Sequence, residues 1–173
     1  FWKPFRAGGV KVRGFNRPSL KDPYSMFQRD HRKLVVIDGK IVFSGGFCVG
    51  QEWAGMDGEP PWRDTGIMIR GPAATIANRA FGRTWSIAGG IFPEPMAEEH
   101  MVAEGETSVW LIEGEPGKSR VLRTLTLVAA VARERLWITD PYFVAPGAIA
   151  EALVSAASAG VDVRVLVPAN NNW

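Results

Sequence analysis

The sequence is short of the residues that form covalent cross-links and metal sites. Its 173 residues include one cysteine, Cys48, and two histidines, His31 and His100. A single cysteine excludes an internal disulfide, which is compatible with a reducing compartment. His100 stands in an acidic stretch without partners, so we expect it to be solvated. His31 therefore becomes the first candidate for chemistry.

Long hydrophobic runs are absent as well. No apolar stretch approaches the ~20 residues that a membrane-spanning helix needs. No signal peptide is visible, but the chain begins at Phe1 without Met, so an upstream leader or anchor would lie outside it. Hydrophobic residues make up 46% of the chain, which is enough for a packed core and makes disorder unexpected. The length suits one ordinary domain or parts of two.

The net charge of +2 conceals an uneven distribution along the chain. Residues 1–40 contain ten Lys or Arg and three acids, whereas residues 41–173 contain ten Lys or Arg and fifteen acids. A local positive field suits an anionic substrate such as a phosphate ester. A solvated basic face explains the same charge distribution equally well, so charge alone does not decide between the two.

The pattern of apolar residues predicts strands that alternate with helices. Asp38-Gly39-Lys40 separates two short apolar runs, which is a strong signal for a β-hairpin. Pro72 and Gly89 bracket a helical pattern. The alternation of strands and helices favours an α/β layered fold. We expect strands at 9–15, 31–37, 41–43, 65–69, 109–112, 136–139 and 161–167, and helices at 72–87, 119–134 (with Ser119 as its cap) and 146–159.

An acidic linker and an internal repeat indicate two halves. Residues 92–106 contain five glutamates, two prolines and no Lys or Arg, and we read them as a linker between residues 1–91 and 107–173. The segment 9–15 also resembles the segment 160–166. His31 lies 22 residues after the start of the first copy, so the corresponding position of the second copy falls beyond the last residue. We therefore expect a nearly complete first half and the beginning of a second half, whose own histidine lies outside this chain.

His31 belongs to a cluster of residues suited to phosphoryl chemistry. The pattern is His31-x-Lys33-x4-Asp38, followed by Gly45-Gly46. Residues two apart on a strand project from the same face, so His31 and Lys33 should lie together while Arg32 points away. The lysine supplies a fixed positive charge for phosphate oxygens and disfavours a second charge on the imidazole. Glycines allow close approach to the backbone.

These residues resemble the phospholipase D superfamily, and within it the bacterial cardiolipin synthase-like members. The pattern from His31 to Gly46 matches the superfamily signature at every defined position. The likeness extends over most of the chain. It includes residues 7–10 with Phe15 and Pro18, residues 62–65 and 70–72, Tyr142-Phe143 with Pro146, and residues 159–164 with Pro168.

The resemblance implies a fold and a mechanism. The fold is a phospholipase D-like sandwich, with a mixed sheet flanked by helices, in which two halves each contribute one motif. One histidine attacks phosphorus and forms a phosphohistidine, and the other protonates the leaving alcohol. His31 is expected to be the nucleophile and Lys33 to bind the phosphate with Gly45 and Gly46. No metal or cofactor is implied. Asp38 should hold the hairpin turn or a contact between the halves.

Three further positions follow from the resemblance. An acid should orient the His31 imidazole as in catalytic triads, and Asp64 is favoured over Asp57 and Glu59. Relatives usually carry Asn where this chain has Cys48, and a thiol is a poor hydrogen-bond donor. We expect Cys48 near the phosphate site without being essential. Tyr142 follows a strand end, a common place for ligand contacts.

The expected function of the whole protein is phosphatidyl transfer or phosphodiester hydrolysis on phospholipid. Phospholipid is then the substrate, with association to a membrane surface and a location at the bacterial inner membrane or in the cytoplasm. Two alternatives remain open: a phosphodiesterase acting on nucleic acid, and a non-catalytic binding or scaffold domain that retains one motif. A second His-x-Lys-x4-Asp in the flanking sequence would favour catalysis, and an upstream hydrophobic leader would favour lipid. With a single motif, the chain alone is expected to be inactive.

Overall fold

The computed structural model describes residues 1–16, 29–56, 58, 60–93, 104–114 and 118–169. The chain divides into two compact units, residues 1–111 and residues 112–173. Leu111, which the sequence assigned to the second half, packs against the core of the first unit. Whether the predicted boundaries at residues 91 and 107 separate two related halves stays a prediction. Among the described residues, no helix is both long and apolar enough to cross a bilayer.

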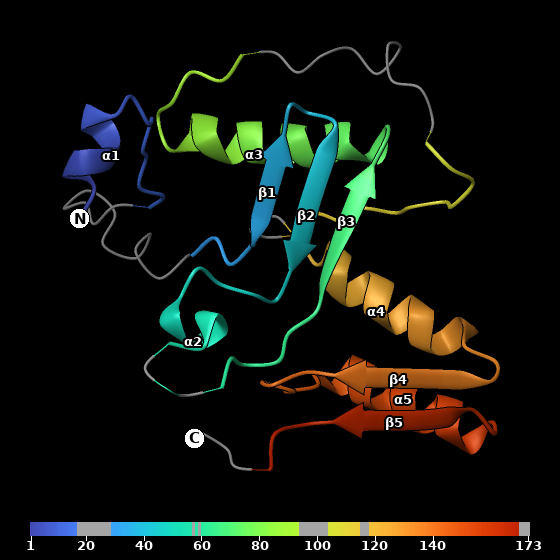
Figure 1. Ribbon diagram of the computed structural model, residues 1–173. Coiled ribbons are helices and arrows are strands. Elements are labelled where there is room, and N and C mark those ends of the chain that lie inside the picture. The colour runs from blue at the N-terminus through green and yellow to red at the C-terminus, as the bar shows by residue number, and fades with distance from the viewer. Residues whose placement is uncertain (17–28, 57, 59, 94–103, 115–117, 170–173) are drawn as a thin grey trace. The chain divides into compact units, whose positions relative to one another are not determined.

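A three-stranded antiparallel sheet with one long helix forms the first unit (Figure 1). The strand order is β1-β2-β3, with Leu34 opposite Ser44 and Gly45 opposite Gly66. The elements are α1 (Lys3–Ala7), β1 (Leu34–Ile37), β2 (Ile41–Gly45), α2 (Gln51–Ala54), β3 (Gly66–Arg70) and α3 (Ala73–Ile87).

The turn between β1 and β2 confirms the predicted hairpin. Lys40 N–H donates to the Ile37 carbonyl over 3.0 Å, which closes a four-residue turn. Both central residues have positive φ, 53° at Asp38 and 67° at Gly39. Turns of this kind match the twist of a hairpin, and Asp and Gly are among the residues that tolerate them. The turn chemistry therefore fixes the pairing of the two strands.

Helix α3 covers one face of this sheet. The fully buried Val42 packs with Ala74 and Ala77 of the helix, and Leu34 and Val36 of β1 border the same core. On the other face, Val35, Ile37 and Met68 are exposed. Strand alternation accounts for this division, because successive side chains point to opposite faces. His31 and Lys33 are in step with Val35 and Ile37, the residues that face away from α3.

The second unit is a two-stranded parallel sheet with two helices. Its elements are α4 (Arg120–Val131), β4 (Arg135–Thr139), α5 (Gly147–Ser158) and β5 (Asp162–Leu166). Strands β4 and β5 pair in parallel, with Trp137 opposite Arg164. A parallel pair needs a crossover, and α5 supplies it, as in a βαβ unit. The mixed α/β character predicted from the sequence is thus confirmed in both units.

The internal repeat corresponds to one local structure that occurs twice. Gly9 and Gly160 have φ of 86° and 91° and follow the ends of α1 and α5. In both copies the next N–H bonds back across the helix end, from Val10 to the Phe5 carbonyl at 2.9 Å and from Val161 to the Ala156 carbonyl at 3.1 Å. This is the glycine-terminated helix end known as the Schellman motif. The repeat therefore marks equivalent helix ends.

Some predicted elements are not formed. Residues 9–14 carry no strand after the first helix end, and residues 109–112 are also irregular. A strand needs a partner to pair with, and no described segment pairs with either. Two short helices, α1 and α2, were not predicted, since five and four residues give too little periodicity to read. Ser119 precedes α4 as expected, but its side chain makes no capping hydrogen bond.

Candidate functional site

The His31 and Lys33 side chains lie together, just before the first strand. β1 begins at Leu34, so the pairing predicted from His31 onward starts three residues later. The Lys33 Nζ lies 3.0 Å from His31 Nδ1 and 3.1 Å from Nε2, and it donates to the His31 carbonyl over 3.0 Å. Ser44 Oγ donates to the Lys33 carbonyl over 3.1 Å, which continues the contact between β2 and this segment.

The contact between the two side chains suits a nucleophilic imidazole. The Lys33 ammonium lies almost equally close to both ring nitrogens, so its positive charge is fixed beside the imidazole. The imidazole is exposed and therefore open to an incoming ligand. A phosphate group approaching Lys33 would meet a positive charge and an adjacent ring nitrogen.

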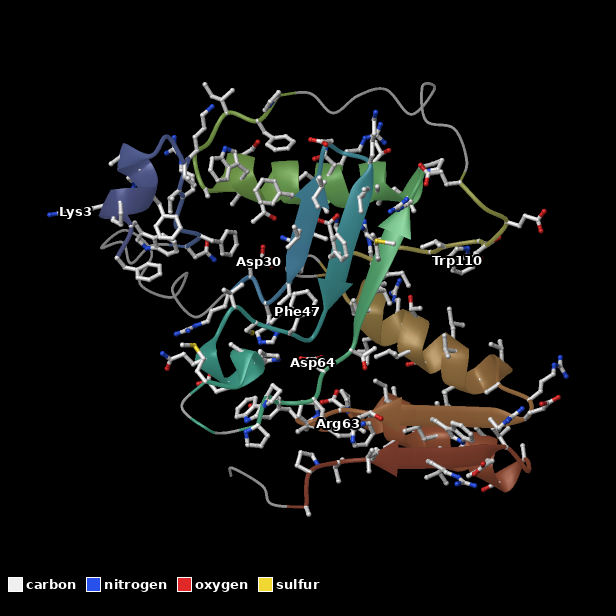
Figure 2. All side chains as sticks on the ribbon, in the orientation of Figure 1. Lys3, Asp30, Phe47, Arg63, Asp64 and Trp110 are labelled. Atoms are coloured by element: carbon white, nitrogen blue, oxygen red, sulfur yellow. The ribbon has the colours of Figure 1, made fainter. Side chains whose placement is uncertain are left out.

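Asp30 and Arg32 alternate with His31 and Lys33 along the chain. They contact each other on the side opposite the His31–Lys33 pair (Asp30 is labelled in Figure 2). Arg32 Nε and Nη2 donate to Asp30 at 2.8 and 2.7 Å, and the Arg32 N–H donates to the same carboxylate at 3.1 Å. Arg32 Nη2 also donates to Thr84 Oγ1 of α3. These hydrogen bonds, with Arg32 as the main cause, hold the pKa of Asp30 below its usual value.

Gly45 and Gly46 lie where backbone and side chains come very close. A Cβ on Gly45 would stand 2.6 Å from the Thr65 carbonyl oxygen and 3.2 Å from the Phe47 ring. A Cβ on Gly46 would stand 2.7 Å from Oδ1 of Asp64. Gly45 therefore needs glycine for packing against the neighbouring backbone, whereas at Gly46 the Asp64 carboxylate lies against the backbone of the motif.

Asp64 lies at the same end of the sheet as His31 but does not bond to it. Its two oxygens accept from Trp53 Nε1 at 2.8 Å and from the Thr65 N–H at 2.7 Å, and Figure 2 shows it where the chain enters β3. Among the described residues, no hydrogen bond joins Asp64 to His31, so the orienting role of Asp64 stays a prediction. Asp57 and Glu59 lie outside the described residues.

The remaining predicted positions are dispersed. Asp38 is exposed at the hairpin turn, as its assignment to the turn requires. Cys48 is half-buried, two residues beyond the glycine pair. Tyr142, in the second unit, is exposed after β4, and its N–H donates to Asp140 over 2.7 Å. His100 lies outside the described residues.

Sequence reasoning missed three groups that surround the motif. Trp53 binds the Asp64 carboxylate and packs edge-on against Trp62, with ring centroids 5.1 Å apart. The Thr84 hydroxyl accepts a hydrogen bond from Arg32. The Phe47 ring lies beside Gly45 and Gly66. Thr84 lies 52 residues from Arg32, so no local pattern could have linked them. The one available signal is that Trp53 and Trp62 follow the motif closely in the sequence.

The comparisons with known proteins point to one group. No family model and no solved structure matches the chain. It is 38% identical over 168 residues to a protein named cardiolipin synthase A from Pseudomonas aeruginosa, and 37% identical over 172 residues to one named cardiolipin synthase from Geobacillus thermodenitrificans. Each match covers 94% of this chain and 34% of the relative. The chain thus spans about a third of the length of the curated relatives it matches.

The similarity covers nearly the whole chain and includes the motif from His31 to Gly46. The similarity over 94% of the chain supports its recognition as a cardiolipin synthase-like member of the phospholipase D superfamily.

Proposed function

We propose that this chain provides one of the two motifs of an enzyme that transfers phosphatidyl groups or hydrolyses phosphodiesters on phospholipids, with His31 as the nucleophile. The observation that carries the proposal is the contact of the Lys33 ammonium with the His31 ring at 3.0 Å, on an exposed side of the chain. Its relatives, which are named cardiolipin synthases, support phospholipid as the substrate class.

In the proposed reaction a ring nitrogen of His31 attacks phosphorus. The N–P bond forms as the bond from phosphorus to the leaving alcohol oxygen breaks, and the alcohol departs with a proton supplied by a second motif. Water or an acceptor alcohol then attacks the phosphohistidine, breaks the N–P bond and restores the imidazole. Lys33 neutralises the phosphate oxygens throughout, so the residues of the motif need no metal for this chemistry.

The other motif residues have supporting roles in this proposal. Asp64 orients the imidazole when the site closes around substrate, since catalytic hydrogen bonds often tighten only in the complex. Gly45 and Gly46 are proposed to face the bound phosphate with their backbone, on the side not filled by Thr65, Phe47 and Asp64, and Cys48 lies at the rim of this site without being essential. Asp38 holds the turn. Tyr142, exposed after β4, is proposed as a ligand contact of the second unit.

We place the chain within a longer protein whose C-terminal part supplies the second motif and completes the sandwich, with helices on both faces of the sheets. Because phospholipids reside in bilayers, the protein works at a membrane surface, and the bacterial inner membrane is the proposed location.

The experiment compares two classes of activated diester on the chain itself. Phosphate esters of p-nitrophenol need no acid to expel the leaving group, so a single motif suffices for one attack. Dioctanoylphosphatidyl-p-nitrophenol represents lipid, and thymidine 5′-(p-nitrophenyl phosphate) represents nucleic acid. We expect a burst of about one equivalent of nitrophenolate, faster with the lipid diester, and no burst in His31→Gln.

Two results would overturn this function. A faster burst with the thymidine ester would favour a nucleic-acid phosphodiesterase. If folded wild-type protein gave no burst with either diester, a binding domain that retains one motif would be favoured.

A further inference from the structure

We propose that Arg32 is a positioning residue for the His31 imidazole. It acts by joining residues 30–33, here called the histidine segment, to helix α3. The inference rests on the proposed function, because the residue that it positions is the proposed nucleophile. The hydrogen bonds of Arg32 to Asp30 and Thr84 act on the backbone to either side of His31.

The histidine segment has little support from the sheet. The pairing of β1 with β2 ends at Leu34 and Ser44, three residues after His31. The Ser44 hydroxyl extends the contact by one residue, to the Lys33 carbonyl at 3.1 Å. An exposed nucleophile before the start of a strand would move freely unless another element held it.

Arg32 supplies a connection at the required place. Its guanidinium spans two partners, the Asp30 carboxylate on one side of His31 and the Thr84 hydroxyl of α3. Two parallel donors to one carboxylate fix the orientation of both groups, which a single-point contact does not. His31 lies between Asp30 and Arg32, so both of its chain neighbours are joined through the guanidinium, which contacts the helix at Thr84.

The geometry explains why this connection leaves the imidazole exposed. On an extended chain, residues at odd and even positions point to opposite sides. Asp30 and Arg32 point to the side of α3, whereas His31 and Lys33 contact each other. The helix in turn packs on the sheet through Ala74 and Ala77, which ties the anchor to the core. The backbone at His31 is thus anchored on the side opposite the exposed imidazole.

The test uses four single variants of the complete chain and the nitrophenolate burst. Arg32→Ala and Thr84→Val remove the connection, Thr84→Ser retains the hydroxyl, and Arg70→Ala is the charge-matched control. Arg70 pairs with Ile41, at the end of the sheet away from His31. We expect the burst rate constant to fall by up to about 10²-fold in Arg32→Ala, because a misplaced reacting group is costly. Thr84→Val should slow it less, and Thr84→Ser and Arg70→Ala should stay near wild type.

A second measurement separates position from overall folding and from activity. The chain contains two histidines, so ring signals in NMR spectra are few and His31→Gln assigns them. We expect ¹³C relaxation to show a more mobile His31 ring in Arg32→Ala and Thr84→Val, with unchanged mobility in Thr84→Ser and Arg70→Ala. The diester concentration at half-saturation should not change in any of the four.

The outcomes are distinct. If wild type gives no burst, the proposed function fails while the ring mobility still tests the positioning role. Equal ring mobility in Arg32→Ala and wild type would overturn the inference. So would a raised half-saturation concentration with an unchanged rate constant, because Arg32 would then serve to bind phosphate.

Discussion

The Trp53 indole holds Asp64 by its N–H, at 2.8 Å from Oδ2. Replacement by Phe would keep the aromatic contact with Trp62 but remove the donor. Hydrogen bonds to charged groups contribute roughly 1.5–3 kcal/mol, and about 1.4 kcal/mol corresponds to tenfold in rate. If Asp64 orients His31 as proposed, Trp53→Phe should slow the nitrophenolate burst about tenfold.

Trp62→Phe is the matched control, since the Trp62 side chain forms an aromatic contact and its backbone N–H, which the change retains, bonds to Glu52. This variant should keep the wild-type burst rate. Equal rates in Trp53→Phe and Trp62→Phe would show that the indole N–H has no part in orienting the nucleophile.

The Asp30 carboxylate should make stability depend on pH in the acid range. Hydrogen bonds from Arg32 hold its pKa in the folded chain below the usual value of 3.8. A depressed folded pKa gives stability that is fully present above the unfolded value and is lost as the pH falls through the folded value. The difference in unfolding free energy between wild type and Asp30→Asn should therefore be constant from about pH 5 to 7 and shrink below about pH 3.8. Urea titrations over this range measure it, and a difference that grows toward acid pH would contradict the assignment.

At the scale of the element, the hairpin separates a structural role of Asp38 from a catalytic one. Asp38 has φ of 53° at the turn, a conformation that Asn tolerates well and β-branched residues do not. Asp38→Asn should leave the unfolding free energy nearly unchanged, whereas Asp38→Val should lower it by about 1–2 kcal/mol. Chemical denaturation followed by tryptophan fluorescence measures both. If Asp38→Asn abolished the nitrophenolate burst in a stably folded chain, a chemical role would replace the turn role.

The glycine pair makes a second prediction about an element, the pairing of β2 with β3. An alanine Cβ at Gly45 would lie 2.6 Å from the Thr65 carbonyl oxygen and 2.8 Å from Gly66 Cα, and neither backbone atom can yield without separating the strands. Gly45→Ala should lower the unfolding free energy by roughly 1–3 kcal/mol.

Gly8→Ala is the control for this change, because Gly8 has φ of −80° and its Cβ would meet ordinary contacts at 3.5 Å. It should alter stability by a few tenths of a kcal/mol at most. Similar losses in the two variants would mean that the close approach at Gly45 relaxes without cost.

The elements were readable from the sequence where local chemistry decides the structure. Asp38-Gly39 predicted the hairpin, and the helix expected at 72–87 begins at Ala73 and ends at Ile87. The strand expected at 9–15 failed because its alternating pattern says nothing about whether a partner strand is present. The contacts of Arg32 with Thr84 and of Trp53 with Asp64 join positions 52 and 11 residues apart, which the motif alone could not reveal.

At the scale of the whole molecule, the number of motifs limits the reaction. The chain contains one His-x-Lys, so attack by His31 on an alkyl diester would expel an alkoxide without a positioned acid. General acid catalysis contributes typically 10²–10⁴-fold. The chain should therefore release no measurable glycerol from phosphatidylglycerol vesicles, although it reacts once with a nitrophenyl diester. Sustained glycerol release that is lost in His31→Gln would instead indicate a homodimer in which two copies of His31 cooperate.

The central claim, that His31 attacks phosphorus, is tested most directly by locating the covalent intermediate. The chain is mixed with dioctanoylphosphatidyl-p-nitrophenol, quenched at alkaline pH to preserve phosphohistidine, and digested for mass spectrometry. The account predicts a phosphatidyl group on the peptide that contains His31, in an amount that matches the nitrophenolate released, and none in the His31→Gln variant. Nitrophenolate release without an adduct, or an adduct on His100 or another side chain, would contradict it.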